Sequence, residues 1–307
     1  MKVVFMGTPD FSVPALERIA EKHQVEAVVT RQDRPKGRGH KVQFTPVKEK
    51  ALELNIPVFQ PEKVRNPEFV DILKQMNPDV IVVIAFGQIL SKEILDLPKY
   101  GCINVHASLL PKYRGAAPIQ WAVIDGQENS GVTTMYMADG IDTGDMIDKT
   151  VVKLDKKETG GSLFDKLALE GGKLILETLE KLENHTATRT PQNEEEATHA
   201  GKITKELGEI DFHRSAVEIE RLIRGLNPWP SAFTFLDGKV LKIWDADVVD
   251  EAVKEEPGTI CSKNKKLKIA TGEGYLDIKE LQLEGKKRMD VISFLNGYQI
   301  NDEKLGK

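Results

Sequence analysis

Cysteine is scarce in this chain of 307 residues, which has two, Cys102 and Cys261, far apart in the sequence. Two isolated thiols offer neither a CxxC redox pair nor a thiolate zinc site. Free thiols are typical of proteins in a reducing compartment. We therefore expect both cysteines to be reduced and the protein to be cytoplasmic.

Long hydrophobic runs are absent as well. The longest apolar run, residues 80–86, has seven residues, whereas a membrane-spanning helix needs about 18. Residues 1–7 contain a short apolar stretch that passes straight into Thr8 and Pro9, without the longer apolar core of a secretory signal. We therefore predict neither a membrane span nor a signal peptide.

An excess of basic residues is also missing, because 43 Lys and Arg stand against 48 Asp and Glu, for a net charge of −5. This balance argues against a nucleic acid as partner, since nucleic-acid-binding proteins usually carry a basic surface. Basic residues nevertheless gather, among glycines, in the segment 31–41. Such a segment suits a phosphate backbone. The alternative is a solvated run of charge, which is usual for a basic loop without glycines or aromatics.

Short apolar segments alternate with helical patterns over the first 184 residues. Several of these segments are apolar on both faces, as in a covered parallel sheet. We expect strands at 3–6, 25–30, 80–86, 102–105 and 132–137, and helices at 12–22 and 162–182. The alternation predicts an α/β fold with a doubly wound, mostly parallel sheet, whose ligands bind at the carboxyl ends of the strands.

The pattern changes after residue 184. Residues 185–207 are polar and contain three consecutive glutamates, a composition typical of an extended linker. After a helix at 216–226, short alternating segments predict a small β-barrel of about five strands. Its strands are expected at 232–236, 240–246, 258–261, 267–271 and 275–283. We therefore predict a first domain at 1–184, a linker at 185–207 and a second domain at 208–307.

Asn104 and His106 are the first candidates for chemistry. They are two residues apart at the end of a predicted strand, so their side chains point to the same face. An amide and an imidazole side by side can stabilise a developing oxyanion and relay a proton. For this pair alone, the simpler explanation is that two polar residues cap the edge of a sheet and satisfy hydrogen bonds there.

Two loops follow that predicted strand. Residues 108–118 are rich in Pro and Gly, where an α/β protein commonly binds its ligand. Asp142 belongs to a second, acidic loop, and an aspartate there could meet the imidazole and orient it, although the loop alone reads as an Asx turn. Its aspartates lack the spacing of a metal site, so we predict no metal.

Residues 7–10 lack the glycines of a dinucleotide fingerprint, which disfavours a nucleotide cofactor.

Eight motifs spread over nearly the whole chain belong together. They are GTPDF at 7–11, DRP at 33–35, GRG at 37–39, GCINVH at 101–106, SLLP at 108–111, RGAAPIQ at 114–120, DTGD at 142–145 and NPWP at 227–230. This set resembles the methionyl-tRNA formyltransferases. Folate-dependent formyltransferases in general share SLLP and DTGD, whereas the basic GRG loop and the NPWP-bearing second domain point to the tRNA member.

The resemblance implies transfer of a formyl group from 10-formyltetrahydrofolate to the amino group of initiator methionyl-tRNA, by a Rossmann-like catalytic domain followed by an OB-like tRNA-binding domain. Asn104, His106 and Asp142 match the catalytic residues of the family. The residues that match its folate-binding segments are Phe86, Gly87, Leu90, Ser108, Leu109, Leu110 and Pro111. We expect a monomer.

Basic residues in two parts of the chain are expected to contact the tRNA. They are Arg34, Lys36, Arg38 and Lys41 in the basic loop, and Lys265, Lys286 and Lys287 in the second domain. Of these, Arg38 matches the arginine that wedges against the acceptor end of the tRNA. The sequence departs from the family at residues 31–33, where a proline is missing, and this bears on the stiffness of the loop and not on its charge.

Three other functions stay open. A formyltransferase for a sugar amine would need a nucleotide-sugar pocket in place of a tRNA surface, and the basic loop and second domain distinguish the two. A formyltetrahydrofolate hydrolase would use the same three polar residues to activate water and would not need Arg38. The second domain could also be mainly an RNA-binding module beside an inactive enzyme, but the presence of all three polar residues argues against this.

Overall fold

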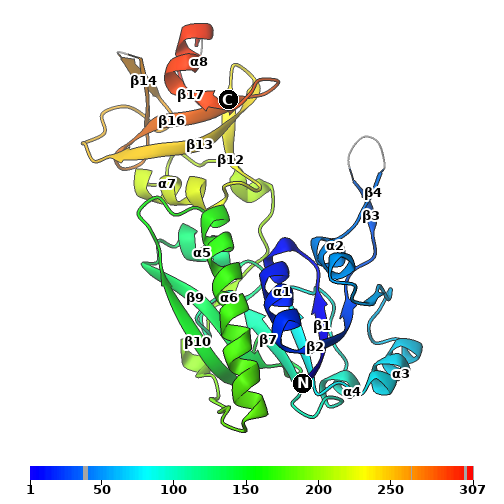
Figure 1. Ribbon diagram of the computed structural model, residues 1–307. Coiled ribbons are helices and arrows are strands. Elements are labelled where there is room, and N and C mark those ends of the chain that lie inside the picture. The colour runs from blue at the N-terminus through cyan, green and yellow to red at the C-terminus, as the bar shows by residue number, and fades with distance from the viewer. Residues whose placement is uncertain (37–40, 264, 301–302, 307) are drawn as a thin grey trace. The chain divides into compact units, whose positions relative to one another are not determined.

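The computed structural model describes residues 1–36, 41–263, 265–300 and 303–306, which form two compact units (Figure 1). The first unit consists of Met1–Pro118, Asn129–Lys153 and Phe164–Ala200. The second consists of Ile119–Glu128, Leu154–Leu163 and Gly201–Lys307. The polar segment 185–207 is therefore shared between the units, and the domain boundaries drawn from the sequence stay a prediction.

A seven-stranded sheet forms the centre of the first unit, in the order β10-β9-β7-β6-β1-β2-β5. The five strands from β7 to β5 run parallel to one another, and β9 and β10 are antiparallel to their neighbours. The strands are β1 (Lys2–Gly7), β2 (Gln24–Val29), β5 (Val58–Phe59), β6 (Val80–Ile84), β7 (Cys102–His106), β9 (Asn129–Tyr136) and β10 (Met146–Lys153). The predicted Rossmann-like, mostly parallel sheet is confirmed.

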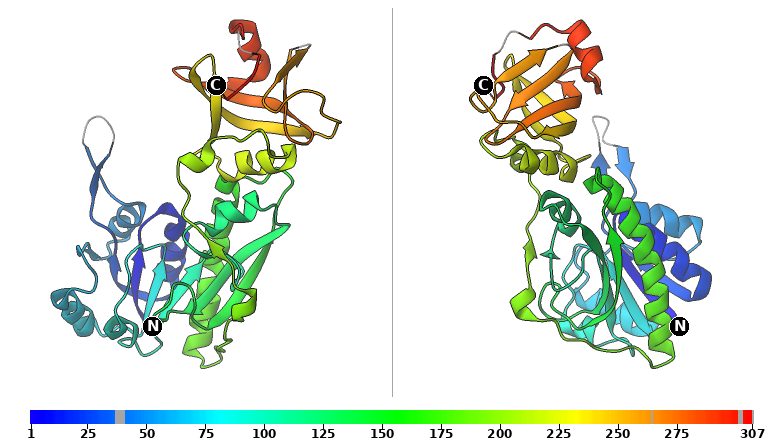
Figure 2. Two further views of the ribbon diagram at one scale, coloured as in Figure 1. Left: turned by 180° about the vertical axis from the view of Figure 1, so that it is seen from behind. Right: turned by 90° about the vertical axis from the view of Figure 1, so that its left-hand side faces the viewer.

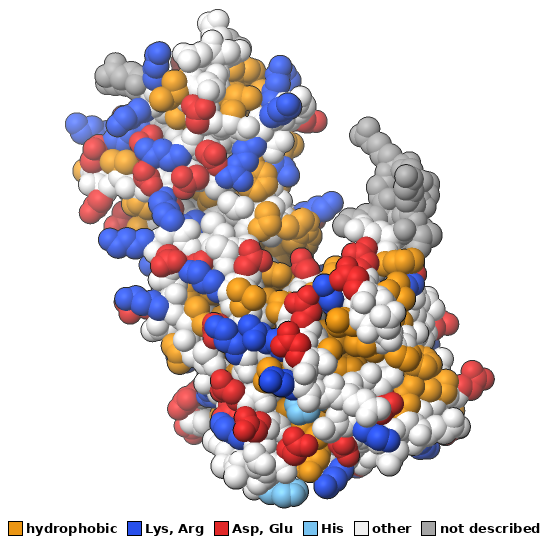
Figure 3. All heavy atoms as spheres, in the orientation of Figure 1, with side chains coloured by type: hydrophobic (Ala, Val, Ile, Leu, Met, Phe, Trp, Pro, Cys, Tyr) orange, Lys and Arg blue, Asp and Glu red, His pale blue; other side chains and the backbone are white. Residues whose placement is uncertain are grey.

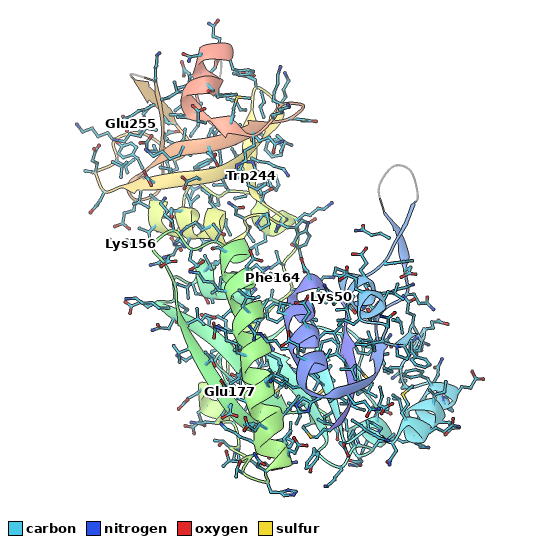
Figure 4. The ribbon with its side chains drawn as sticks, viewed as in Figure 1. Lys50, Lys156, Phe164, Glu177, Trp244 and Glu255 are labelled. Carbon is cyan, nitrogen blue, oxygen red and sulfur yellow. The ribbon has the colours of Figure 1, made fainter. Side chains whose placement is uncertain are left out.

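Helices cover this sheet, and α1 and α6 lie on the same face of it (Figures 1 and 2). The α-helices up to residue 183 are α1 (Val13–Lys22), α2 (Pro46–Glu53), α3 (Pro67–Met76), α4 (Lys92–Leu95), α5 (Pro118–Ile124) and α6 (Gly160–Glu183). Phe164 on α6 packs edge-on against Phe11, with ring centroids 5.2 Å apart (Figure 4). Every residue of β6 is buried, as its unbroken apolar sequence predicts.

Two small pairs of strands stand apart from the main sheet. β3 (Arg34–Lys36) and β4 (Lys41–Gln43) form an antiparallel hairpin in the basic loop. β8 (Arg114–Gly115) and β11 (His199–Ala200) run parallel to each other. Neither pair was predicted from the sequence, because strands of two or three residues are too short to show a periodic pattern.

In the second unit, an antiparallel sheet of order β12-β13-β16-β15-β14 curls into a half-barrel, with β17 beside β16 (Figure 2). Its elements are η3 (Glu206–Gly208), α7 (Ala216–Gly225), β12 (Ala232–Leu236), β13 (Lys239–Val249), β14 (Ile260–Lys263), β15 (Lys266–Ala270), β16 (Tyr275–Leu283), β17 (Met289–Asp290) and α8 (Val291–Gly297). Ile219 and Ile223 of α7 pack into the same buried cluster as Leu241 and Ile278 of the sheet. The predicted barrel-like second domain is thus confirmed.

Hydrogen bonds connect residues 154–163 to the rest of the second unit. The Gly161 amide donates to the carbonyl of Asn227 at 2.9 Å, and Arg224 Nη1 donates to the carbonyl of Glu158 at 2.7 Å.

Within the described parts of the chain, no helix combines the length and the apolar character needed to cross a membrane.

Candidate active site

The carboxyl end of β7 brings three of the predicted polar side chains together. Asn104 and His106 lie on this strand, and Asp142 lies in the loop between β9 and β10. Asn104 Nδ2 is 3.5 Å from Asp142 Oδ1, and His106 Nδ1 is 3.6 Å from Asp142 Oδ2. The side chains of His106 and Asp142 are only 8% and 14% exposed. The meeting of these three residues follows from the adjacency of β7 and β9, and their catalytic role stays a prediction.

The backbone of Asp142 is left-handed, with a φ of 54°. Asp and Asn adopt this conformation more readily than most other residues with a side chain. The Gly115 amide donates to Asp142 Oδ2 at 2.8 Å and so helps to hold the carboxylate in place. Gly115 itself has a φ of 109°, and a Cβ there would lie 2.9 Å from the Ala200 carbonyl oxygen, which explains the glycine.

One nitrogen of the His106 ring is already bonded to the backbone. Nε2 lies 2.8 Å from the carbonyl oxygen of Tyr113. Because a carbonyl accepts hydrogen bonds and cannot donate them, Nε2 carries the proton in this contact. Nδ1 is therefore the nitrogen that faces Asp142 and any group bound between them. Sequence reasoning missed Tyr113 and Gly115, because the atoms that act here belong to the backbone.

The segment Ser108 to Pro111 is tied to β9 through the buried Thr133. The Leu110 amide donates to Thr133 Oγ1 at 3.2 Å, and that hydroxyl donates to the Ser108 carbonyl at 2.7 Å. Ser108 Oγ donates to the Lys112 carbonyl at 2.6 Å. Of the four predicted residues, Leu109 alone is only partly buried, and Ser108, Leu110 and Pro111 are buried.

The turn after β6 ends that strand two residues earlier than predicted, because Ala85 has a φ of 46°. Phe86 and Leu90, both predicted to bind folate, pack into a buried cluster together with residues of β1 and β6. Gly87 is exposed and has a φ of 76°. Ile89 is 75% exposed. The accessible surface of this turn is thus formed by residues that alternate with the buried ones.

Hydrogen bonds hold the stem of the basic loop. Lys48 Nζ bonds to Asp33 and to Gln60 Oε1, the latter at 2.8 Å. Gln60 Nε2 in turn donates to the Arg31 carbonyl at 2.7 Å and to Asp33 Oδ1 at 2.8 Å. Burial alone would raise the pKa of Asp33, but hydrogen bonds from Lys48 and Gln60 hold that pKa below its ordinary value. The stem is therefore fixed by side chains, although the proline of the family pattern is missing.

Arg31 also connects this stem to the turn after β6, because its Nη2 donates to the Gly87 carbonyl at 2.6 Å. Beyond the stem, Arg34, Lys36 and Lys41 belong to the β3–β4 hairpin. Arg38 lies outside the described residues.

Three predicted tRNA contacts lie in the second unit. Lys265 is exposed in the turn between β14 and β15, and Lys286 and Lys287 are exposed in the turn between β16 and β17. On the face seen in Figure 3, Lys and Arg side chains of this unit are interspersed with Asp and Glu.

Among the residues that the structure describes, no group of His, Cys, Asp and Glu is arranged to hold a metal ion.

Comparison with protein families matches two models to this chain. Residues 1–179 match the formyl transferase family, and residues 202–299 match the formyl transferase C-terminal domain. The methionyl-tRNA formyltransferase of Agathobacter rectalis is 60% identical over 304 residues, covering 98% of both chains. That of Clostridioides difficile is 53% identical over 302 residues, again covering 98% of both chains.

Solved structures with the same fold are more distant in sequence. WlaRD, a sugar 3N-formyl transferase, superimposes with a TM-score of 0.69 at 19% identity, over 94% of this chain and 99% of its own. HypX from Aquifex aeolicus, in complex with tetrahydrofolic acid, gives a TM-score of 0.61 at 18% identity, over 99% of this chain and 50% of its own. At these identities the likeness concerns the fold alone.

Proposed function

This chain belongs to the methionyl-tRNA formyltransferases, and from that membership we propose that it transfers the formyl group of 10-formyltetrahydrofolate to the amino group of initiator methionyl-tRNA. The product is N-formylmethionyl-tRNA for translation initiation. The observation that carries the proposal is the approach of Asn104, His106 and Asp142 at the carboxyl end of β7, because acyl transfer needs a donor to an oxyanion and an acceptor for a proton.

The proposed reaction begins when the neutral α-amine attacks the formyl carbon. A C–N bond forms and the formyl oxygen becomes an oxyanion, which accepts hydrogen bonds from the Asn104 amide and from His106. Because His106 Nε2 is bonded to Tyr113, we propose that the imidazolium donates from Nδ1. Asp142, directly or through a water, accepts the proton that leaves the ammonium, and N10 of the folate takes up a proton as its bond to the formyl carbon breaks.

The two substrates are proposed to bind at different elements. The exposed turn around Gly87 and the segment Ser108 to Pro111 flank the carboxyl ends of β6 and β7, where a doubly wound sheet binds its ligands, and we assign the folate to them. For the tRNA we propose the β3–β4 hairpin with Arg38, together with the exposed lysines of the second unit. We further propose that the protein acts as a monomer in the cytoplasm, without a metal.

The test is to incubate the protein with 10-formyltetrahydrofolate and methionyl-tRNA, initiator or elongator, and to follow formyl-methionine. We expect formylation of the initiator tRNA, weakening as salt is raised from low to moderate concentration because phosphate contacts release counterions. Asn104→Ala should retain the fold and lose turnover roughly 100-fold, as loss of one oxyanion donor does. Transfer to a nucleotide-sugar amine, or release of formate without any acceptor, would contradict the proposal.

A further inference from the structure

The polar segment that precedes the second unit forms hydrogen bonds with two loops of the candidate active site. Within the first unit, β11 pairs with β8, so that the Arg114 amide donates to the Thr198 carbonyl at 2.8 Å and the Ala116 amide donates to the Ala200 carbonyl at 2.9 Å. Thr198 Oγ1 also accepts from the Tyr113 amide at 2.8 Å. The stretch held in this way contains both backbone groups that bond to the predicted catalytic residues.

Gln192 reaches the acidic loop from this same segment. Its Nε2 donates to the carbonyl oxygens of Asp142 and Gly144, each at 2.8 Å. A side-chain amide has two N–H donors, so both are used on the two residues that flank Thr143. The loop is therefore closed across Thr143 by one side chain that comes from 50 residues further along the chain.

Arg114 fixes the other end of the Gln192 amide. Its Nε donates to Gln192 Oε1 at 2.9 Å, which orients the amide so that both N–H groups point at the loop. The two Nη atoms of Arg114 donate to Glu194 at 2.9 and 2.8 Å, in the paired geometry that a guanidinium forms with a carboxylate. Arg114 is 2% exposed, so its orientation is set by these partners and by packing.

The position of the Asp142 carboxylate depends on this arrangement. A left-handed residue other than glycine persists where its surroundings hold it, and at Asp142 the surroundings are the Gly115 amide on the carboxylate and the Gln192 amide on the carbonyl. Relaxation of the loop would carry the carboxylate away from Asn104 and His106. Displacing a reacting group by about 1 Å can cost on the order of 100-fold in rate.

We propose that Gln192, oriented by Arg114 and Glu194, is a positioning residue of the formyl transfer, which acts by holding the Asp142 backbone so that its carboxylate faces Asn104 and His106. This inference rests on the proposed function. The polar segment around residues 192–200 is accordingly part of the active-site structure and not only a connection between the two units.

The test uses Gln192→Met in the full-length protein, because methionine keeps the length of the side chain and removes both donors. We expect kcat to fall on the order of 10- to 100-fold, with KM for both substrates little changed, since neither substrate contacts Gln192 in the proposal. The pH dependence of kcat should also shift relative to the wild type. Gln192→Glu, which keeps the acceptor for Arg114, gives the same test if the methionine variant fails to fold.

Gln24→Met is the matched control, because it makes the same substitution at an exposed residue at the start of β2. Gln24 Nε2 donates to Glu26 of its own strand, so its loss should leave kcat and its pH dependence at wild-type values. A double variant with Asp142→Asn completes the experiment, because a residue that acts through Asp142 adds little once the carboxylate is gone. A Gln192→Met variant with the same kcat as Gln24→Met, or fully additive losses in the double variant, would overturn the inference. A wild-type protein without formyl transfer would instead overturn the proposed function.

Discussion

Substitution of Asp142 by Asn and by Ala separates the chemistry of this residue from its conformation. Asn tolerates the left-handed backbone at φ 54° and can offer its amide oxygen to the Gly115 N–H. Its NH2 group then takes the place of Oδ1, where it faces the Asn104 amide, and one donor points at another. The variant keeps the loop and loses the carboxylate that the mechanism needs.

The expected magnitudes differ sharply between the two variants. For Asp142→Asn we expect a loss of at least about 2.7 kcal/mol of transition-state stabilisation, or roughly 100-fold in kcat, and a free energy of unfolding within about 1 kcal/mol of wild type. Asp142→Ala loses the same chemistry. It also adds about 1–2 kcal/mol for a left-handed alanine and about 1–3 kcal/mol for an unpaired Gly115 amide, so that the total is about 2–5 kcal/mol.

Formyl-methionine production, with urea unfolding in parallel, measures both quantities on the same preparations. Equal inactivity with unequal stability is the expected result. An Asn variant that turns over within about threefold of wild type would refute the role of the carboxylate. An Ala variant as stable as the Asn variant would refute the account of the loop.

Three further outcomes follow from other parts of the chain. Burial raises the pKa of the Cys102 thiol to about 12, so we expect a thiol reagent at neutral pH to titrate Cys261 alone in the native protein and both in denaturant; rapid reaction of two thiols would contradict this. Ser215→Ala removes the cap of α7 and should cost about 1 kcal/mol in urea unfolding, whereas an unchanged midpoint would show that the cap is dispensable. Gly87→Ala places a Cβ 2.2 Å from the Arg31 guanidinium at a φ of 76° and should raise KM for 10-formyltetrahydrofolate several-fold; an unchanged KM would remove this turn from the proposed folate site.

The sheet of the first unit was predictable where its strands are buried on both faces. Residues 3–6 of β1 and all residues of β6 form unbroken apolar runs, which are typical of a covered sheet. β10 was missed because it lies at the edge of the sheet, where its burial alternates and charged residues face outward. The predicted strand at 80–86 was too long, because left-handed residues such as Ala85 leave no mark on hydropathy.

In the site, the sequence predicted side chains and missed backbone groups. Asn104 and His106 could be paired because strand periodicity places alternate residues on one face. The Tyr113 carbonyl and the Gly115 amide carry no signal in residue type, although both bond to the predicted catalytic residues. The stem of the basic loop is likewise held by contacts that the local sequence does not reveal. There the missing proline suggested lower stiffness, whereas Lys48 and Gln60, distant in sequence, supply the restraint.

The polar segment at 185–207 shows why composition misjudges some segments. A stretch poor in apolar residues cannot bury much surface, and that is all its composition measures. It can still be ordered by hydrogen bonds, and here Gln192 and Thr198 make such bonds to the loops around Asp142 and Tyr113. Because each of these bonds joins residues at least 50 positions apart, local pattern could not reveal them. Net charge misleads for the same reason, since a total of −5 describes no particular surface, whereas the field that a charged partner would meet depends on local groups such as the basic residues at 31–41.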